Sequence, residues 1–213
     1  MINKNLEQQA QAFFKNLFSR SKNFENTTLG MVTTNIRERI GDKMAVVLSA
    51  INVGKLQPSD EFFTKRVYSK NISKYIIVSD GNFAYNPDRI NIGSIGINDL
   101  DTTGCVSPVY IVFSVDSEYQ SFFEFYFKTA TFKAETKQRA SGSVRQSLNY
   151  NDFSLIEIQY PDRKTAKAFN DFWLNQKKFI LQLKKENARL MELRDTLLPK
   201  LMSGELDIST LDL

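Results

Sequence analysis

The fold of this chain is decided by residues 169–201, which read FNDFWLNQKKFILQLKKENARLMELRDTLLPKL. Apolar side chains recur in this stretch every seven residues, a spacing that brings them onto one side of a helix. The first seam of the repeat contains Phe169, Gln176, Leu183, Leu190 and Leu197, and the second contains Phe172, Phe179, Glu186 and Leu193. The stripe is widened, one position past the second seam, by Trp173, Ile180 and Leu201.

The length of this helix separates it from an ordinary surface helix. No Gly or Pro interrupts residues 162–198, so at ~1.5 Å per residue the helix spans roughly 50 Å, more than the width of a small domain. We therefore expect its far end to leave the globular part, although an amphipathic helix folded onto its own domain is the alternative. Pro199 and then Ser203-Gly204 predict its end.

A second, shorter helix is predicted at the start of the chain. Ile2, Leu6, Phe13 and Leu17 recur there at helical spacing in a stretch without Gly or Pro, and the polar segment 19–28 ends it. Its apolar face needs a partner, and the long helix is the natural one. The sequence leaves open whether the two helices pair within one chain or between two.

Composition limits the remaining possibilities. With 213 residues and 42% hydrophobic content, the chain can bury one core of perhaps ~130 residues plus a helical appendage. The formal charge of +4 and pI near 9.0 permit a polyanionic partner. A single cysteine, Cys105, suits a reducing compartment. The polar N-terminus and the lack of a long apolar run predict a cytoplasmic protein without a leader or membrane segment.

The region between the two helices is predicted to be an α+β domain with a mixed or antiparallel sheet. Short apolar runs bounded by Gly, Asn, Asp and Pro indicate strands. These runs cover residues 44–51, 75–78, 105–115 and 155–158. One helix is predicted at residues 119–132, because Phe122, Phe123, Tyr126, Phe127 and Ala130 form one apolar face. Such a mixture differs from a regular alternation of strand and helix.

The sequence contains few of the residues that commonly catalyse reactions. The chain contains no histidine, which excludes a Ser-His-Asp arrangement and the common zinc sites, and one cysteine cannot form a thiolate cluster. One nuclease-like pattern survives: Asp88 followed by Glu135 and Lys137, which imitates the carboxylates and lysine of a magnesium-dependent nuclease. That site requires the two carboxylates on adjacent strands, whereas Glu135 follows a predicted helix. We therefore predict no metal site and no catalytic residue in this chain.

Two polar clusters carry the side chains that a DNA groove requires. Arginine can form two hydrogen bonds to guanine, and a carboxamide can do the same with adenine, while lysine binds phosphate without regard to sequence. The first cluster contains Asn82, Tyr85, Asn86, Arg89 and Asn91. The second, around Gly142, contains Lys133, Lys137, Arg139, Ser143, Arg145 and Gln146. Each cluster alone is compatible with an ordinary solvated loop; two of them beside a long helix favour nucleic-acid binding.

Several segments resemble the specificity (S) subunits of type I restriction-modification systems. GNFAYNP at 81–87, GSIG at 93–96, GCVSP at 104–108 and GSVRQSL at 142–148 resemble a target-recognition domain. LRDTLLPKLMSGEL at 193–206 resembles the end of the distal spacer helix of that family, and INKNLEQQA at 2–10 resembles the end of its central one. The resemblance covers nearly the whole chain, with the motifs in the family's order. S subunits of this family usually carry two recognition domains, so the chain resembles a half-subunit.

The resemblance implies an organisation and a function. It divides the chain into an N-terminal spacer helix at 1–19, a target-recognition domain at 20–160, and a C-terminal coiled-coil helix and tail at 161–213. Two copies are expected to pair and read a bipartite inverted-repeat site in double-stranded DNA. The residues expected at the interface with a second copy or a partner helix are Phe169, Phe172, Trp173, Phe179, Ile180, Leu183, Leu190, Leu193 and Leu197.

The implied role is delivery rather than catalysis. A specificity subunit of this family docks methyltransferase (M) subunits, which bring S-adenosylmethionine and methylate adenine, and restriction (R) subunits join for cleavage. No cofactor is expected on this chain. The alternatives are a stand-alone magnesium-dependent nuclease and a coiled-coil scaffold that does not bind DNA. A decoy half-subunit that redirects a host methyltransferase is a variant of the first interpretation.

Overall fold

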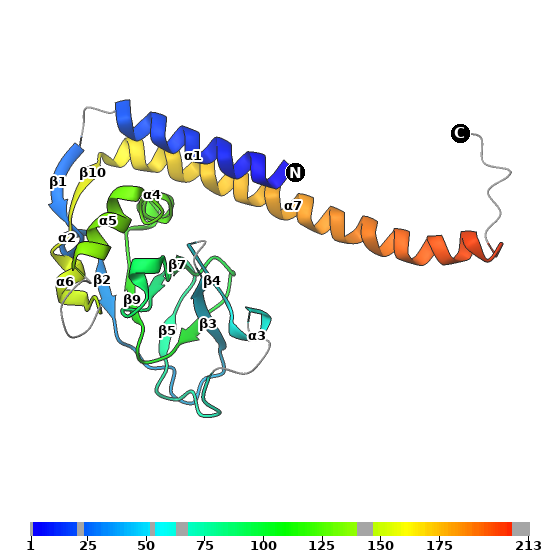
Figure 1. Ribbon diagram of the computed structural model, residues 1–213, viewed down its shortest axis with the longest axis horizontal. Helices are drawn as coiled ribbons and strands as arrows, with labels where there is room; N and C mark the ends of the chain where they lie inside the picture. Colours follow the sequence, from blue (N-terminus) through cyan, green and yellow to red (C-terminus); the bar gives the residue numbers. More distant parts are fainter. Residues whose placement is uncertain (1, 21–23, 52–53, 63–67, 140–146, 206–213) are drawn as a thin grey trace. The chain divides into compact units, whose positions relative to one another are not determined.

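The computed structural model describes residues 2–20, 24–51, 54–62, 68–139 and 147–205. The chain divides into two units, which we call the helical unit, Met1–Ala10 with Asp171–Leu213, and the sheet unit, Gln11–Asn170. Two helices run from one unit into the other, α1 (Ile2–Arg20) and α7 (Arg163–Met202). In each unit the two helices lie antiparallel and side by side (Figure 1).

The sheet unit contains the remaining elements. Its strands are β1 (Phe24–Thr28), β2 (Thr34–Ile36), β3 (Val46–Ile51), β4 (Lys55–Pro58), β5 (Ile76–Val78), β6 (Phe83–Tyr85), β7 (Ile95–Ile97), β8 (Gly104–Val106), β9 (Ile111–Ser114) and β10 (Glu157–Pro161). Its helices are α2 (Leu29–Val32), α3 (Ser59–Phe62), α4 (Gln120–Tyr126), α5 (Ala130–Arg139) and α6 (Tyr150–Ser154), with 3-10 turns η1 (Ile90–Ile92) and η2 (Ser117–Tyr119). The α+β class expected from the sequence is confirmed.

Eight strands form one mixed sheet in the order β2-β9-β6-β7-β4-β3-β8-β5, and β1 pairs with β10 in a separate ribbon. The β4–β7 and β3–β8 pairs are parallel, and the others are antiparallel. A glycine permits one close pairing: a Cβ on Gly96 would lie 2.4 Å from the Lys55 carbonyl carbon, closer than real Cβ contacts. The sheet is mixed, as the sequence predicted.

One predicted strand differs in its boundaries from the strands observed. The run at 105–115 is two strands, β8 and β9, because a turn at Ser107-Pro108 separates them, closed by a 2.9 Å hydrogen bond from Tyr110 N to the Ser107 carbonyl. The short strands β6 and β7 were not predicted as strands, because three-residue runs flanked by polar loops give too little periodicity.

The single helix predicted at 119–132 is also two helices. α4 ends at Tyr126, and α5 begins at Ala130. Between them, the Thr129 hydroxyl donates to the Tyr126 carbonyl at 2.7 Å and accepts from Phe132 N at 3.2 Å, so it caps the second helix. The aromatic face of α4 is nevertheless buried as expected, with Phe123 fully inaccessible.

The short N-terminal helix finds its partner within the chain. In the sheet unit, the ring of Phe169 on α7 lies 5.9, 5.3 and 5.7 Å from the rings of Phe13, Phe14 and Phe18 on α1, and 5.1 Å from the ring of Phe125 on α4. Phe169 is fully buried as a result. This answers the question that the sequence left open for these residues: the α1 stripe packs on α7 of the same chain.

The helix α7 ends directly before Ser203-Gly204, which the sequence predicted as its stop, whereas Pro199 does not end it. Pro199 lies inside its last turn, and the helix continues to Met202, where Ser203 N donates to the Pro199 carbonyl at 2.9 Å. Gly204 then adopts a positive φ of 75°, the left-handed conformation that commonly follows a helix end. Over its 40 residues the helix is ~60 Å long. Of the helices described in this structure, none has the length and apolarity to cross a membrane.

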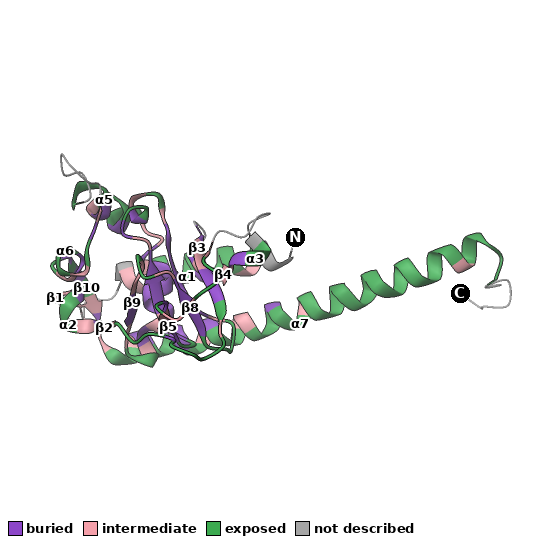
Figure 2. Cartoon of the chain, turned by 90° about the horizontal axis from the view of Figure 1, so that it is seen from below, coloured by how far each residue is buried: buried purple, intermediate pink, exposed green. Residues whose placement is uncertain are grey.

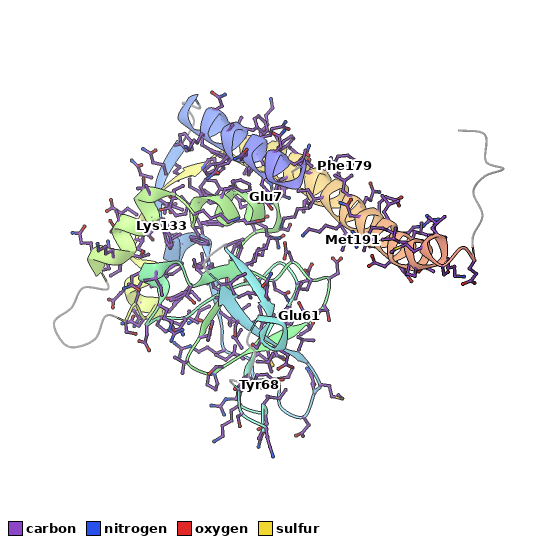
Figure 3. All side chains as sticks on the ribbon, turned by 45° about the vertical axis from the view of Figure 1, so that its right-hand side comes forward. Glu7, Glu61, Tyr68, Lys133, Phe179 and Met191 are labelled. Atoms are coloured by element: carbon purple, nitrogen blue, oxygen red, sulfur yellow. The ribbon has the colours of Figure 1, made fainter. Side chains whose placement is uncertain are left out.

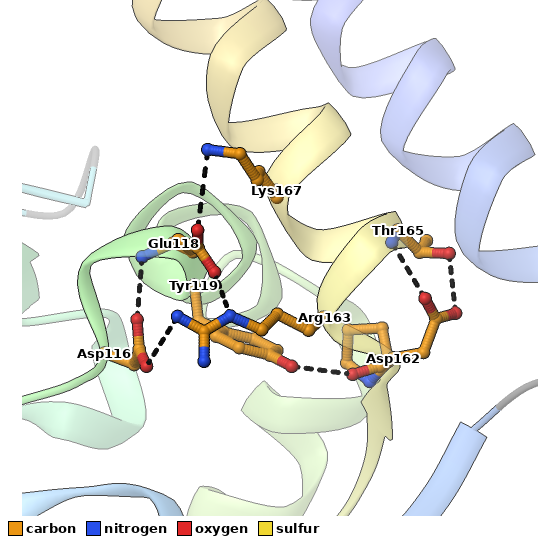
Figure 4. A network of polar contacts seen from close by, with 8 residues as sticks. Asp116, Glu118, Tyr119, Asp162, Arg163, Thr165 and Lys167 are labelled. Carbon is orange, nitrogen blue, oxygen red and sulfur yellow. Dashed lines mark hydrogen bonds and ion pairs between the residues drawn. The ribbon is translucent and has the colours of Figure 1, made fainter.

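A cap and an ion-pair network fix the first turns of α7 in the sheet unit (Figure 4). Asp162 accepts hydrogen bonds from Thr165 N at 3.0 Å and from the Thr165 hydroxyl at 2.7 Å, which hold the pKa of its carboxyl below the usual value. Arg163 and Lys167 both reach the Glu118 carboxylate, Lys167 at 3.4 Å. The start of the long helix is thereby tied to the segment before α4.

Candidate nucleic-acid interface

The turn after β6 is closed by hydrogen bonds and carries Asn86, Arg89 and Asn91 of the first predicted cluster. Asn86 accepts a hydrogen bond from Asp88 N on its side-chain oxygen at 3.0 Å, and its carbonyl accepts from Arg89 N at 3.0 Å. The Arg89 carbonyl in turn accepts from Ser94 N at 3.1 Å, and Gly93 closes the turn with a φ of 90°. Arg89 is exposed at this turn, and Asn86 and Asn91 are half-buried. The hydrogen bonds hold the backbone of the turn, and Arg89 is the exposed member of the predicted cluster on it.

The second cluster begins on α5, which buries two of its side chains and exposes its lysines. Phe132 and Thr136 are buried, whereas Lys133 and Lys137 are exposed (Figure 3 labels Lys133). Arg139, the last residue of α5, donates from Nε to Glu135 Oε1 at 2.7 Å and from Nη2 to the Leu155 carbonyl at 3.4 Å. The two lysines are therefore the freer cationic groups of this helix, and Arg139 is already engaged.

The structure brings these two clusters together. Helix α5 packs against η1, and Leu148 N donates to the Pro87 carbonyl at 3.0 Å, which joins the chain after the second cluster to the turn of the first. We call the surface formed by residues 86–92 and α5 the η1–α5 face. Its charged residues are four cationic, Arg89, Lys133, Lys137 and Arg139, and two anionic, Asp88 and Glu135. A net positive, polar surface of this kind suits the edge of a DNA groove.

Two predicted residues do not belong to this face. Tyr85 has no exposed surface, because its ring lies 5.1 Å from that of Phe153 and 6.3 Å from that of Phe113, so the prediction that it contacts DNA is wrong. Burial also raises the pKa of its hydroxyl far above the usual range. Asn82 lies at the opposite end of β6 from Asn86, ~13 Å along the strand, where its backbone pairs with Asn98.

The remaining predicted residues of the second cluster, Ser143, Arg145 and Gln146, lie outside the described residues. The structure adds one residue to the face instead. Ile92 is 68% exposed at the end of η1, beside Asn91. Sequence reasoning missed it because an apolar side chain in a short run is normally assigned to the core.

The nuclease-like pattern does not form the required arrangement. Glu135 lies on helix α5 and is paired with Arg139, instead of standing on a strand beside the one that precedes Asp88. Within the described residues, no group of three or more His, Cys, Asp or Glu side chains is placed to hold a metal ion. The single cysteine, Cys105, is buried in the sheet core, which raises the pKa of its thiol to about 11.

The predicted heptad stripe divides into a covered and an uncovered part. Phe169, Trp173 and Ile180 are buried within the chain, so of the two predicted partners, a second copy or a partner helix, they are not available to a second copy, and Phe169 packs on the helix α1. Phe172 and Leu183 are half-buried. The other predicted interface residues are exposed. Figure 2 shows the C-terminal part of α7 almost entirely as exposed surface. The exposed members are Phe179 (48%), Leu190 (53%), Leu193 (45%) and Leu197 (41%).

Comparison with known proteins identifies the fold. No family profile matches the chain, and no curated protein matches it by sequence. Among solved structures, the chain is similar to the S subunit of a type I restriction-modification system from M. genitalium, with 17% identity and a TM-score of 0.55 over 94% of this chain and 54% of that one. It is also similar to the HsdS subunit from Thermoanaerobacter tengcongensis, with 15% identity and a TM-score of 0.49 over 96% and 52%.

The chain therefore has the fold of type I restriction-modification S subunits, with one sheet domain. It spans about half the length of each of the two solved chains.

The burial of Tyr85 yields a testable prediction. Its hydroxyl has no hydrogen-bond partner among the described residues, so Tyr85→Phe should raise the free energy of unfolding by about 1 kcal/mol. Tyr150→Phe is the matched control: the Tyr150 hydroxyl lies 2.9 Å from the Thr33 hydroxyl, and its loss should destabilise the fold by about 1 kcal/mol. Urea denaturation measures both variants. A destabilised Tyr85→Phe protein would contradict the assignment.

Proposed function

We propose that this chain is the DNA-binding specificity component of a type I restriction-modification system, acting as a half-subunit. The observation that carries the proposal is the η1–α5 face: two polar clusters, more than forty residues apart in the sequence, form one net-basic surface on a fold shared with S subunits. The proposed role is non-catalytic, because the chain contributes no histidine and its one cysteine is buried.

The proposed chemistry divides the face into two kinds of contact. Arg89, exposed on a held turn, presents a planar guanidinium that matches the two acceptors on guanine in the major groove, and Asn91 beside it offers a carboxamide suited to adenine. Lys133 and Lys137 on α5 bind phosphates and so position the domain. Ser143, Arg145 and Gln146 belong to the same proposed reading surface from the sequence alone.

Binding experiments with two lysine variants and one arginine variant test this division. Lys133→Ala should weaken all duplexes alike and lower the slope of log affinity against log salt by about 1, whereas Arg145→Ala should relax base preference by about 1–3 kcal/mol. Lys164→Ala, an exposed lysine outside the face, is the control and should change neither quantity. Unchanged preference in Arg145→Ala would refute its reading role.

The same measurements separate the rival functions. A nuclease would cut DNA with magnesium and no partner, and Asp88→Ala would abolish the cutting. A scaffold would show no salt-dependent DNA binding at all. Neither rival is supported by a specific feature of the described residues, because the carboxylates of the nuclease pattern are not brought together as a metal site.

We further propose that two copies pair through the exposed part of α7. Exposed leucines at the seam positions 190, 193 and 197 form a continuous apolar stripe, and fully burying one such side chain contributes about 1.5–3 kcal/mol. An antiparallel pair of these helices would recreate a whole subunit with two sheet domains. Because such a dimer has a two-fold axis, the DNA site it reads is an inverted repeat with a fixed gap.

Light scattering coupled to size exclusion tests the pairing. The wild-type chain should elute at micromolar concentration with twice its mass of 24.5 kDa. A triple change of Leu190, Leu193 and Leu197 to alanine should give a monomer, since it removes the apolar seam from both copies. The control changes Leu181, Met191 and Leu198 to alanine, which are equally exposed on the same helix but lie off the seams. A monomeric wild type would contradict the proposal.

The proposed partners are methyltransferase subunits, which carry S-adenosylmethionine, and restriction subunits for cleavage. The chain should co-purify with a type I methyltransferase subunit, and the complex should methylate adenines within one inverted-repeat sequence. Mapping of methylated adenines in co-expressing cells measures this outcome. Methylation that is unchanged when the chain is omitted would contradict it.

A further inference from the structure

A second basic surface lies in the sheet unit, away from the η1–α5 face in sequence. Two loops form it: residues 37–45, between β2 and β3, and residues 68–75, which lead into β5 (Tyr68 is labelled in Figure 3). We call this surface the basic loop pair. Neither loop was predicted to bind a ligand, because each carries only two or three basic residues, separated along the sequence by other residues.

Backbone hydrogen bonds hold the two loops against each other. Ile40 N donates to the Tyr75 carbonyl at 2.8 Å, Gly41 N donates to the Ser73 carbonyl at 3.0 Å, and Ile77 N donates to the Glu38 carbonyl at 2.8 Å. Within the second loop, Ser73 N donates to the Asn71 side-chain oxygen at 2.9 Å. The loops therefore form an ordered continuation of the sheet.

The alternation of side chains along this pairing separates apolar from basic groups. Ile40, Tyr75 and Ile77 point inward and pack in one buried cluster with Val47 and Cys105. Arg39, which forms a bridge with Ile76, and Lys74 are exposed. An open groove of about 440 Å³ lies between the loops, lined by residues 41–45 and 70–73. Its rim includes the exposed Lys43 and Lys70.

The basic loop pair carries a large positive charge for its small number of residues. Its basic residues are Arg37, Arg39, Lys43, Lys70 and Lys74, and its acidic residues are Glu38 and Asp42, so it carries a formal charge of +3, while the whole chain carries +4. Lys43 forms a long, exposed ion pair with Glu38 at 3.8 Å. No acidic group in the described part of the chain forms an ion pair with the other four cations. The charge is available to an external anion.

We infer that the basic loop pair is a second DNA-contact surface, which binds the phosphate backbone of duplex DNA without regard to sequence. The ligand is an extended polyanion rather than a small anion, because the cations are exposed and spread over two loops instead of converging in an enclosed pocket. Three of the five cations are lysines, which act as point charges toward phosphate. The inference rests on the proposed function and adds an anchor that is distinct from the reading surface.

The test compares two charge-matched variants of the full-length chain. In the first, Arg39, Lys43 and Lys74 are changed to glutamine; in the control, Lys164, Lys178 and Lys184, exposed on α7, are changed to glutamine. Both lose the same charge, and circular dichroism verifies that both remain folded. Affinity is measured across a salt series for the target duplex, identified from mapped methylation or by selection, and for a scrambled duplex of equal length.

In the loop variant, the slope of log affinity against log salt should fall by about two to three, and affinity at 0.1 M salt should fall on the order of 100-fold for both duplexes. The ratio of target to scrambled affinity should stay unchanged, and the control should keep the wild-type slope. A wild-type slope in the loop variant would overturn the inference, and so would loss of affinity for the target alone. If the wild-type chain binds neither duplex at low salt, the proposed function itself fails.

Discussion

Aromatic packing around Phe169 is the interaction on which the rest of this structure depends. Its ring meets Phe13, Phe14 and Phe18 of α1 and Phe125 of α4 within the sheet unit. Aromatic rings bury large apolar areas and gain further energy from tilted and edge-on contacts. The two helices that meet here lie near opposite ends of the sequence, so their pairing closes a long loop at an entropic cost that this burial must exceed. Without this cluster, α1 would lose the partner that its aromatic side chains have on α7 within the sheet unit.

Polar contacts mark the start of α7 and join its first turns to the sheet unit. The cap on Asp162 defines where α7 begins, and the Glu118 carboxylate holds Arg163 and Lys167 on its first turns (Figure 4). Arg163 is 70% exposed, so its ion pairs contribute little free energy. They join the first turns of α7 to the segment before α4. In the same region the rings of Tyr119 and Tyr160 stack with centroids 4.3 Å apart, and burial raises the pKa of both hydroxyls.

Charge is distributed on the sheet unit in a way that total composition conceals. The chain as a whole carries only +4, a value that gives weak support for a nucleic-acid partner. Folding groups four cations on the η1–α5 face and five on the basic loop pair, so that each surface carries a net positive charge. A reading surface and an anchoring surface on one domain would separate specificity from affinity. The exposed stripe would serve a third purpose, the pairing of two such domains.

The sequence by itself determined the elements whose signal is local. A seven-residue repeat without Gly or Pro predicts a long helix, and the structure confirms it; the N-terminal helix and the α+β class are confirmed as well. Only the tertiary structure decided which side chains on those elements are exposed and so available to bind a partner. Tyr85 and Phe169 belong to patterns that looked functional, yet both are buried, because long-range packing selects the face of each element that turns inward. For the same reason, the approach of α5 to η1 could not be derived from spacing along the chain: periodicity records neighbours within an element, whereas contacts between distant segments depend on how the whole core closes.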